Sequence, residues 1–199
     1  MEYYLNIILF AGLSYLIGSI STAIITCKIM GLEDPRKVGS NNPGATNVLR
    51  HGGKKAAIIT LLGDMLKGLI PVLVIVQLQA DALTVALVGL FALLGHIFPI
   101  YYGFKGGKGV ATYYGAILGI NWLVGLIALA IWLTMAALFK ISSLSALVSI
   151  LLTPFILWHF SQSAELTGAA ALMSLIVFWR HQNNIKQLIQ GTEERIDKG

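Results

Sequence analysis

The sequence predicts an all-α integral membrane protein with about seven transmembrane helices, its N-terminus outside the cell and its C-terminus in the cytoplasm. Composition is the first observation behind this prediction: 56% of the 199 residues are hydrophobic and only 12% are charged, whereas about 25% are charged in a soluble domain. The second is a series of apolar runs of about 20 residues, the length that a helix needs to cross a bilayer. Little is left for a soluble domain, so we expect a single membrane domain over residues 1–199.

The first three apolar runs are each long enough to cross the bilayer alone. The first covers 3–27. The second, 56–78, follows the polar loop 28–55, and the third, 82–101, follows a polar turn near 77–81. We therefore expect three full spans in this half of the chain.

The fourth run, 108–120, is short. Its apolar part Val110–Ile120 covers about 16 Å of helix at 1.5 Å per residue, so we expect a half-helix, a re-entrant segment or one arm of a bent hairpin. Asn121 marks the turn into the next span. The remaining candidate spans are 121–139, 142–160 and 163–180.

The distribution of Lys and Arg sets the orientation, because cytoplasmic loops carry an excess of both. If the N-terminus is outside and all seven segments cross, the outside loops near 77–81, 119–122 and 159–165 hold neither residue. Lys67 lies within the second span, and the other cations fall on the cytoplasmic side. The cytoplasmic polar segments are then 28–55, 101–109 and 180–199.

Charge and cysteine content argue against several other classes of protein. The formal net charge of +5 is too small, and too confined to loops, for a nucleic-acid-binding protein. The single cysteine, Cys27, excludes an internal disulfide and a cysteine metal cluster. Glu2 and the absence of a cation before the first apolar run argue against a cleavable signal.

Each cytoplasmic segment contains a cluster of glycine, small hydroxyl or amide residues and cations. The three clusters are Gly39–Arg50, Phe104–Thr112 and Arg180–Asn184. Glycine lets backbone N–H groups approach a ligand closely, and Lys or Arg supplies positive charge, a combination that suits phosphate. Three such clusters at one edge of a membrane predict a protein that handles phosphate esters there.

The first cluster has the pattern of tight turns that open a helix. Arg50 lies four residues after Thr46 and therefore on the same helix face. Backbone N–H groups, a hydroxyl and a guanidinium can thus converge on one anion. The alternative is an ordinary polar loop in which Ser40 and Asn47 merely cap helices.

The second cluster resembles a phosphate-binding loop, although it is not a Walker A motif. No Ser or Thr follows Lys108, and the spacing of the glycines differs. A flexible linker whose lysines reach toward the membrane surface is the alternative. His96, which precedes the cluster, is more typical of a hydrogen-bonded core histidine than of a catalyst.

The third cluster follows the last span. His181 and Asn184 are three residues apart, so both can face one bound ligand. The structural alternative is equally strong here, because cations at a helix C-terminus are favoured by the helix dipole whatever the function.

Asp64 and Lys67 lie inside the second span, three residues apart. Each alone would cost about 2.5–3.5 kcal/mol at the centre of a membrane, so we expect them to form an ion pair. Charges in spans usually face a polar cavity, which leaves open whether this pair shapes the site or contacts a ligand.

Together these motifs resemble the bacterial acyl-phosphate glycerol-3-phosphate acyltransferases, the PlsY family, over almost the whole chain. The sequence departs from the family pattern at Asn41 and Pro43, where Gly and an aliphatic residue are expected, and at Ser21, near a position often held by Pro. The matching residues are Gly18, Ser19, Lys28, Asp34, Arg36, Gly39–Arg50, Asp64, Lys67, Gly68, Gly95, His96, Phe98, Pro99, Phe104–Thr112, His181, Asn184, Ile185 and Gly191–Glu193.

The resemblance implies an enzyme that moves an acyl group from acyl phosphate to the 1-hydroxyl of glycerol 3-phosphate, giving lysophosphatidic acid and phosphate without a cofactor or a metal. It implies catalytic roles for Lys108, His181 and Ser40. The general base stays open between His181 and a phosphate group of the bound substrates. The implied substrate-binding residues are Gly44, Ala45, Thr46, Asn47, Arg50, Gly106, Gly107, Ser143, Asn184 and Ile185.

The same resemblance implies a multi-pass protein of the bacterial inner (plasma) membrane with its active site on the cytoplasmic side. The acyl chain would lie between spans among the membrane lipids, and the enzyme that makes acyl phosphate would be a transient partner. The alternative class is a transporter of a phosphorylated solute, which glycine-interrupted helices also suit. A transporter is expected to show internal repeats and polar groups on both faces, whereas these clusters share one face.

Overall fold

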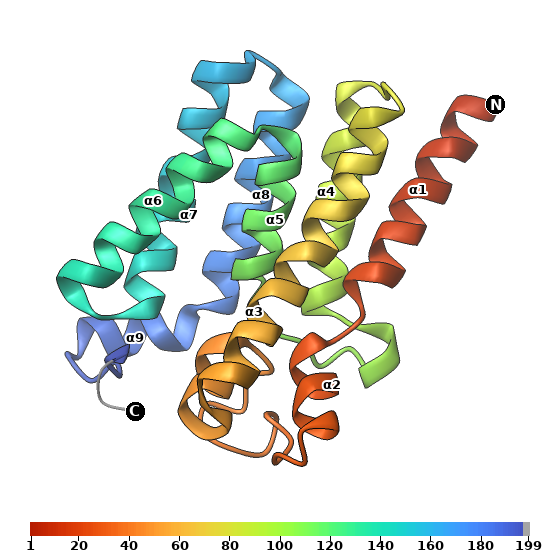
Figure 1. Cartoon of the computed structure of the whole chain (residues 1–199). Helices are drawn as coiled ribbons and strands as arrows, with labels where there is room; N and C mark the ends of the chain where they lie inside the picture. The colour runs from red at the N-terminus through yellow and green to blue at the C-terminus, as the bar shows by residue number, and fades with distance from the viewer. Residues whose placement is uncertain (197–199) are drawn as a thin grey trace.

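The structure is a computed structural model that describes residues 1–196, and these residues form nine α-helices and one short 3-10 helix without a strand (Figure 1). The predicted all-α class is confirmed. Residues 197–199, part of the predicted segment 180–199, lie outside the described range. The helices are α1 Glu2–Gly18, α2 Thr22–Ile29, α3 Ala45–Gln77, α4 Ala82–Ile97, η1 Ile100–Tyr102, α5 Val110–Ile120, α6 Trp122–Phe139, α7 Ser142–Ser161, α8 Ala164–Arg180 and α9 Gln182–Ile189.

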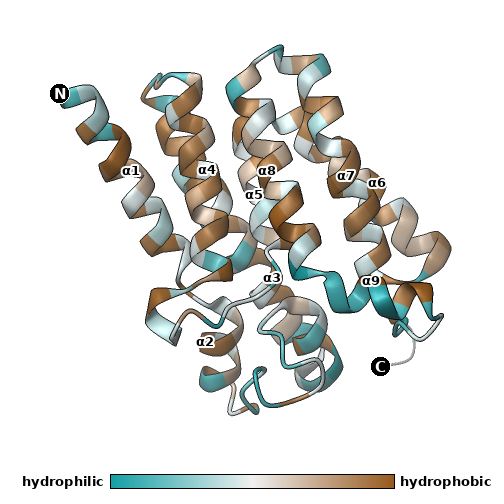
Figure 2. Ribbon diagram, turned by 180° about the vertical axis from the view of Figure 1, so that it is seen from behind, coloured by the Kyte–Doolittle hydropathy of each residue, from teal (hydrophilic) through white to brown (hydrophobic). Residues whose placement is uncertain are grey.

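The long helices stand side by side and alternate in direction (Figure 1). From the N-terminus at the upper end, α1, α4, α6 and α8 run downward, and α3, α5 and α7 return. Figure 2 shows that hydrophilic residues gather at the lower end, around α9 and the loops beside α2, while the long helices are mostly hydrophobic. The three polar clusters therefore belong to one end of the bundle.

Five helical segments are long and apolar enough to cross a membrane among the residues that the structure describes. Val110–Ile120 is a shorter apolar helix, as the sequence predicts. The integral membrane class is confirmed, whereas seven crossings and the orientation stay predictions. The five segments are Glu2–Ile29, Ala45–Gln77, Ala82–Tyr102, Trp122–Phe139 and Ser142–Ser161.

The first predicted span, 3–27, is two helices rather than one. After α1 ends at Gly18, Ser21 becomes the N-cap of α2 and its hydroxyl accepts a hydrogen bond from the N–H of Ile24. The carbonyl of Ile20, within the break, accepts from Nζ of Lys67 at 2.7 Å. A residue of α3 thus satisfies a backbone group that the interruption leaves without a helical partner.

Helix α3 is longer than the predicted span 56–78, because it begins at Ala45 inside the first polar cluster. Gly53, with a φ of 81°, is not helical and divides α3 into two helical parts that meet at a kink. The pattern of turns that open a helix is therefore confirmed at Gly44, the N-cap residue. Asn121 likewise caps α6 by accepting from the N–H groups of Leu123 and Val124, as expected for a turn between α5 and α6.

Glycine allows the closest helix contacts. A Cβ on Gly115 of α5 would lie 2.0 Å from the carbonyl oxygen of Met65 in α3, and one on Gly95 of α4 would lie 2.2 Å from that of Tyr15 in α1. Real Cβ atoms do not approach so near, so these helices pack backbone against backbone. The α3–α5 contact places the start of α5 beside Asp64, whose carbonyl accepts a hydrogen bond from the Thr112 hydroxyl at 2.9 Å.

Candidate active site

A cavity of about 290 Å³ is lined by residues of all three polar clusters. One part of its wall is apolar, with Leu61 and Met65 from α3 and Leu129, Trp132 and Leu133 from α6. Leu61 and Leu133 remain 42% and 61% exposed, so the apolar part reaches the side of the helical bundle. The predicted site residues that line the cavity are Ser40, Gly44, Ala45, Thr46, Asn47, Arg50, Lys108, Ser143, His181 and Asn184.

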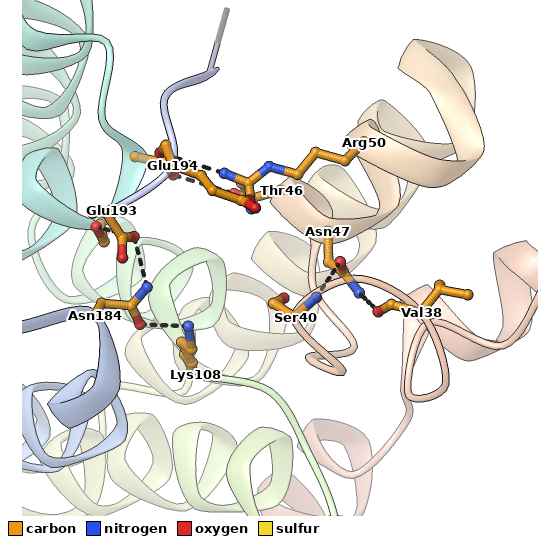
Figure 3. Close-up of polar contacts among 11 residues, drawn as sticks. Val38, Ser40, Thr46, Asn47, Arg50, Lys108, Asn184, Glu193 and Glu194 are labelled. Carbon is orange, nitrogen blue, oxygen red and sulfur yellow. Dashed lines mark hydrogen bonds and ion pairs between the residues drawn. The ribbon is translucent and has the colours of Figure 1, made fainter. Parts of the chain in front are cut away.

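Asn47 fixes the shape of the first loop. Its buried side chain donates to the carbonyl of Pro35 at 2.8 Å. It also donates to the carbonyl of Val38 at 3.0 Å and accepts from the N–H of Ser40 at 3.1 Å (Figure 3). The side chain of Asn47 could contact a ligand, as predicted, only by giving up one of these hydrogen bonds to the loop. Its position is what holds Ser40 at the cavity wall.

Thr46 and Arg50, one turn apart on α3, face parts of the chain far away in sequence. The Thr46 hydroxyl lies 3.2 Å from that of Ser142 at the start of α7. Nη1 of Arg50 forms an ion pair with Oε2 of Glu194 at 2.6 Å (Figure 3). The C-terminal segment thus places a carboxylate on the guanidinium that was predicted to bind phosphate.

Gly106 and Gly107 do not line the cavity. Their N–H groups donate to the carbonyls of Ile97 and His96, each at 3.2 Å, so these groups are already bonded to main chain. Direct phosphate binding by the two glycines is therefore not supported. Their lack of a side chain has a packing reason, because a Cβ on Gly106 would lie 2.0 Å from the His96 carbonyl oxygen.

Four residues of the second cluster line the cavity: Lys108, Gly109, Val110 and Ala111, of which Lys108 carries the charge. Nζ of Lys108 donates to Oδ1 of Asn184 at 2.5 Å (Figure 3). Burial lowers the pKa of the Lys108 ammonium, and the nearby guanidinium groups of Arg180 and Arg50 act in the same direction, while Glu193 opposes them. The site therefore holds a cation that an anionic ligand would stabilise.

His181 is held as a neutral imidazole. It is 3% exposed, and its Nδ1 donates to the carbonyl of Val177 at 2.8 Å, which leaves Nε2 with its lone pair. Burial, the largest cause, lowers the pKa of His181 to about 4. Three residues on, Asn184 also lines the cavity, as predicted, whereas Ile185 does not.

Glu193 lines the cavity but was not among the predicted site residues, although it ends the matching stretch Gly191–Glu193. Its Oε1 accepts from Ser143 at 2.6 Å and from Asn184 at 2.7 Å (Figure 3). Its Oε2 is buried without a hydrogen-bond partner among the described residues. Lys108, Asn184, Glu193 and Ser143 thus form one continuous polar chain along the cavity.

Asp64 and Lys67 form the predicted ion pair, with Oδ1 and Nζ 2.9 Å apart and both side chains buried. Asp64 lines the cavity together with His96, whose Nδ1 lies 3.7 Å from the same carboxylate oxygen. Lys67 does not line the cavity but bonds to the break between α1 and α2. The pair therefore serves the fold through Lys67 and borders the site through Asp64.

The sequence model described as "Glycerol-3-phosphate acyltransferase" matches residues 8–191. The chain belongs to this family. It is 55% identical to the glycerol-3-phosphate acyltransferase of Thioalkalivibrio sulfidiphilus, over 92% of this chain and 90% of that protein. It is 51% identical to that of Methylococcus capsulatus, over 92% of each chain.

A solved structure of PlsY (YgiH), an integral membrane glycerol 3-phosphate acyltransferase in its glycerol 3-phosphate form, superposes with a TM-score of 0.92. It is 34% identical and covers 96% of this chain and 95% of that one. The lysophosphatidic acid form gives a TM-score of 0.90 at 32% identity. The resemblance drawn from the sequence is confirmed, and the family favours an enzyme over the transporter alternative.

Proposed function

We propose that the protein transfers a fatty acyl group from acyl phosphate to the 1-hydroxyl of glycerol 3-phosphate, releasing lysophosphatidic acid and phosphate. The observation that carries this proposal is the two-part cavity. Its polar part presents Arg50, Lys108 and Asn184, and its apolar part runs along Leu61 and Leu133 to the side of the bundle. Such a cavity suits a substrate whose phosphate binds in the polar part and whose acyl chain lies in the apolar part, beside the lipids.

The leaving phosphate belongs near Lys108 and the start of α3. The N–H groups of Ala45, Thr46 and Asn47 have no intrahelical acceptor, because they open the helix, and a helix N-terminus favours an anion. Ser40 and Lys108 line the same cavity and add a hydroxyl and an ammonium. These groups stabilise the charge that develops as the bond between acyl carbon and phosphate oxygen breaks.

Glycerol 3-phosphate belongs near Arg50, Ser143, His181 and Asn184. A guanidinium makes two parallel hydrogen bonds to a phosphate, which anchors the dianion and aims its hydroxyl groups. To bind there, the substrate phosphate replaces the Glu194 carboxylate on Arg50. The oxygen of the 1-hydroxyl then attacks the acyl carbon.

The proton of that hydroxyl goes to a phosphate group of the bound substrates. A histidine with a pKa of about 4 is a weak base near neutral pH. A phosphate monoester, with a second pKa of about 6, is the stronger acceptor. His181 then orients the acceptor substrate through Nε2, and phosphate departs as the ester forms.

No metal is required for this chemistry, because an acyl phosphate is a mixed anhydride with a good leaving group. We propose that acyl-CoA and acyl carrier protein are not donors. The test incubates purified protein in detergent with acyl phosphate and glycerol 3-phosphate, with and without a chelator, and with acyl-CoA as an alternative donor. We expect glycerol 3-phosphate to be acylated when acyl phosphate is the donor, with or without chelator, and not when acyl-CoA is the donor. Loss of turnover with chelator, restored by a divalent ion, would refute metal independence, and equal rates with acyl-CoA would refute the donor.

The protein lies in the bacterial inner membrane with its active site on the cytoplasmic side. There the site can receive acyl phosphate from the enzyme that makes this donor. The cations of the loops support this placement, because cytoplasmic loops carry an excess of Lys and Arg. Cysteines introduced at Lys37 and Lys186 should react with an impermeant reagent from the cytoplasmic side, and one at Gln79 from the other. If the cysteines at positions 37 and 186 reacted from opposite sides of the membrane, the topology would be wrong.

A further inference from the structure

Arg180 is a half-buried cation that does not line the cavity, yet it touches the loop that carries Lys108. Its Nη2 donates to the carbonyl of Gly106 at 3.2 Å, and its Nε donates to the carbonyl of Gly107 at 3.3 Å. One planar guanidinium therefore holds two successive peptide groups. A lysine ammonium has no such fixed fork of donors.

Gly106 and Gly107 also have close contacts on their other sides. Their N–H groups donate to the backbone of α4, and a Cβ on Gly107 would lie 2.2 Å from Nε2 of His96. It would also lie 3.1 Å from the carbonyl oxygen of Pro43 in the first cluster. The peptide groups just before Lys108 are thus fixed between α4, the first loop and Arg180.

We propose that Arg180 is a positioning residue: by holding the carbonyls of Gly106 and Gly107 it sets the place of the Lys108 ammonium at the leaving phosphate. This inference rests on the proposed function, because the role of Lys108 does. Arg180 and Asn184 lie four residues apart, so the end of α8 and the start of α9 secure Lys108 at both its backbone and its Nζ. Arg180 itself touches neither substrate.

The first experiment compares Arg180→Gln and Arg180→Lys with Lys186→Gln, a matched loss of an exposed cation on α9. We expect Arg180→Gln to lower kcat by about 100-fold, the scale of an ångström misplacement of a catalytic group. Arg180→Lys should be intermediate, and Lys186→Gln should match the wild type. The KM for glycerol 3-phosphate should change little in all three, because Arg50 anchors that substrate.

The second experiment separates positioning through Lys108 from a general contribution to the fold. If Arg180 acts through Lys108, adding Arg180→Gln to Lys108→Ala should change kcat by no more than about twofold, the error of additivity. Multiplied losses in the double variant, or wild-type kcat in Arg180→Gln, would overturn the proposal. If Arg180→Gln does not fold, the same cycle is run with Arg180→Lys.

Hydrogen–deuterium exchange tests the clamp without any turnover, so it remains decisive if the proposed reaction fails. The Gly106 and Gly107 amides are protected by their bonds to α4. We expect them to exchange faster in Arg180→Gln than in Lys186→Gln, with unchanged exchange in the helical core. Equal exchange in the two variants would show that Arg180 does not hold the loop. Absence of ester formation by the wild type would refute the proposed function instead.

Discussion

Lys108 and Asn184 are joined by a short hydrogen bond at the cavity wall, where an ammonium can meet a departing phosphate. We expect Lys108→Ala to lower kcat by about 10²–10³-fold, equivalent to about 2.7–4 kcal/mol of lost stabilisation. Lys105→Ala is the control, because Lys105 is exposed and lies outside the cavity wall. Steady-state kinetics with acyl phosphate measure both. More than about a third of the wild-type rate in folded Lys108→Ala protein would remove Lys108 from the transition state.

Arg50 offers two parallel donors to a phosphate, which a lysine does not reproduce. Arg50→Lys should therefore raise the KM for glycerol 3-phosphate about tenfold, the loss of one charge-assisted hydrogen bond. The KM for acyl phosphate should change less. Both constants come from varying one substrate at saturation of the other. A change confined to acyl phosphate would mean that the two phosphate sites are assigned the wrong way round.

The pH dependence of kcat distinguishes the two possible bases. Burial lowers the pKa of His181 to about 4, below its usual 6.5, so the imidazole is already neutral throughout pH 5.5–8 and adds no proton step there. A substrate phosphate titrates near pH 6. We expect wild type and His181→Asn to share one profile shape at saturation of both substrates. A step near pH 6.5 that disappears in His181→Asn would make the histidine the base.

At the scale of helices, the contact between α3 and α5 depends on glycine. Gly115→Ala would press a methyl group against the Met65 carbonyl and push α5 away from α3, and Lys108 lies just before α5. We expect a loss of about 1–3 kcal/mol in stability, seen as a lower Tm in detergent. Gly168→Ala in α8 meets no atom within 4 Å and should be neutral or stabilising. An equal effect of the two substitutions would contradict the close contact.

Helix positions could be predicted from the sequence because apolar runs and capping residues are local signals. The break between α1 and α2 was missed, because the run is apolar on both sides of Gly18, although Gly18 and the N-cap Ser21 are local signals for it. What supports the break is Lys67 of α3, whose ammonium bonds to the Ile20 carbonyl. A partner 47 residues away leaves no mark in the local pattern.

The candidate site was predictable to a similar degree, and for the same reason. Arg50, Lys108 and Asn184 carry side chains whose chemistry can be read directly, and they line one cavity. The part played by Gly106 and Gly107 could not be predicted in this way, because their N–H groups donate to the carbonyls of Ile97 and His96. Glu193 gained its place only through bonds to Ser143 and Asn184, which the fold brings together.

At the scale of the whole molecule, the cavity lies where the first loop, the start of α5 and the C-terminal segment converge at one end of the bundle (Figure 3). Each belongs to a different part of the chain, yet α3 begins and α8 ends toward the lower end of the bundle (Figure 1). A soluble phosphate compound can enter from this end. A lipid tail can enter from the side, so the two substrates need not share an entrance.

The ion pair within α3 also bears on how the chain enters the membrane. Asp64 and Lys67 are neighbours on one helix, so they can neutralise each other before any later helix is made. Asp64→Asn leaves an unpaired ammonium in the apolar segment, at a cost of about 2.5–3.5 kcal/mol. We expect poorer insertion of that segment by the translocation machinery, and recovery in Asp64→Asn with Lys67→Met, measured by a glycosylation reporter. Equal insertion of the wild type, the single variant and the double variant would mean that Asp64 and Lys67 pair only after the helices have assembled.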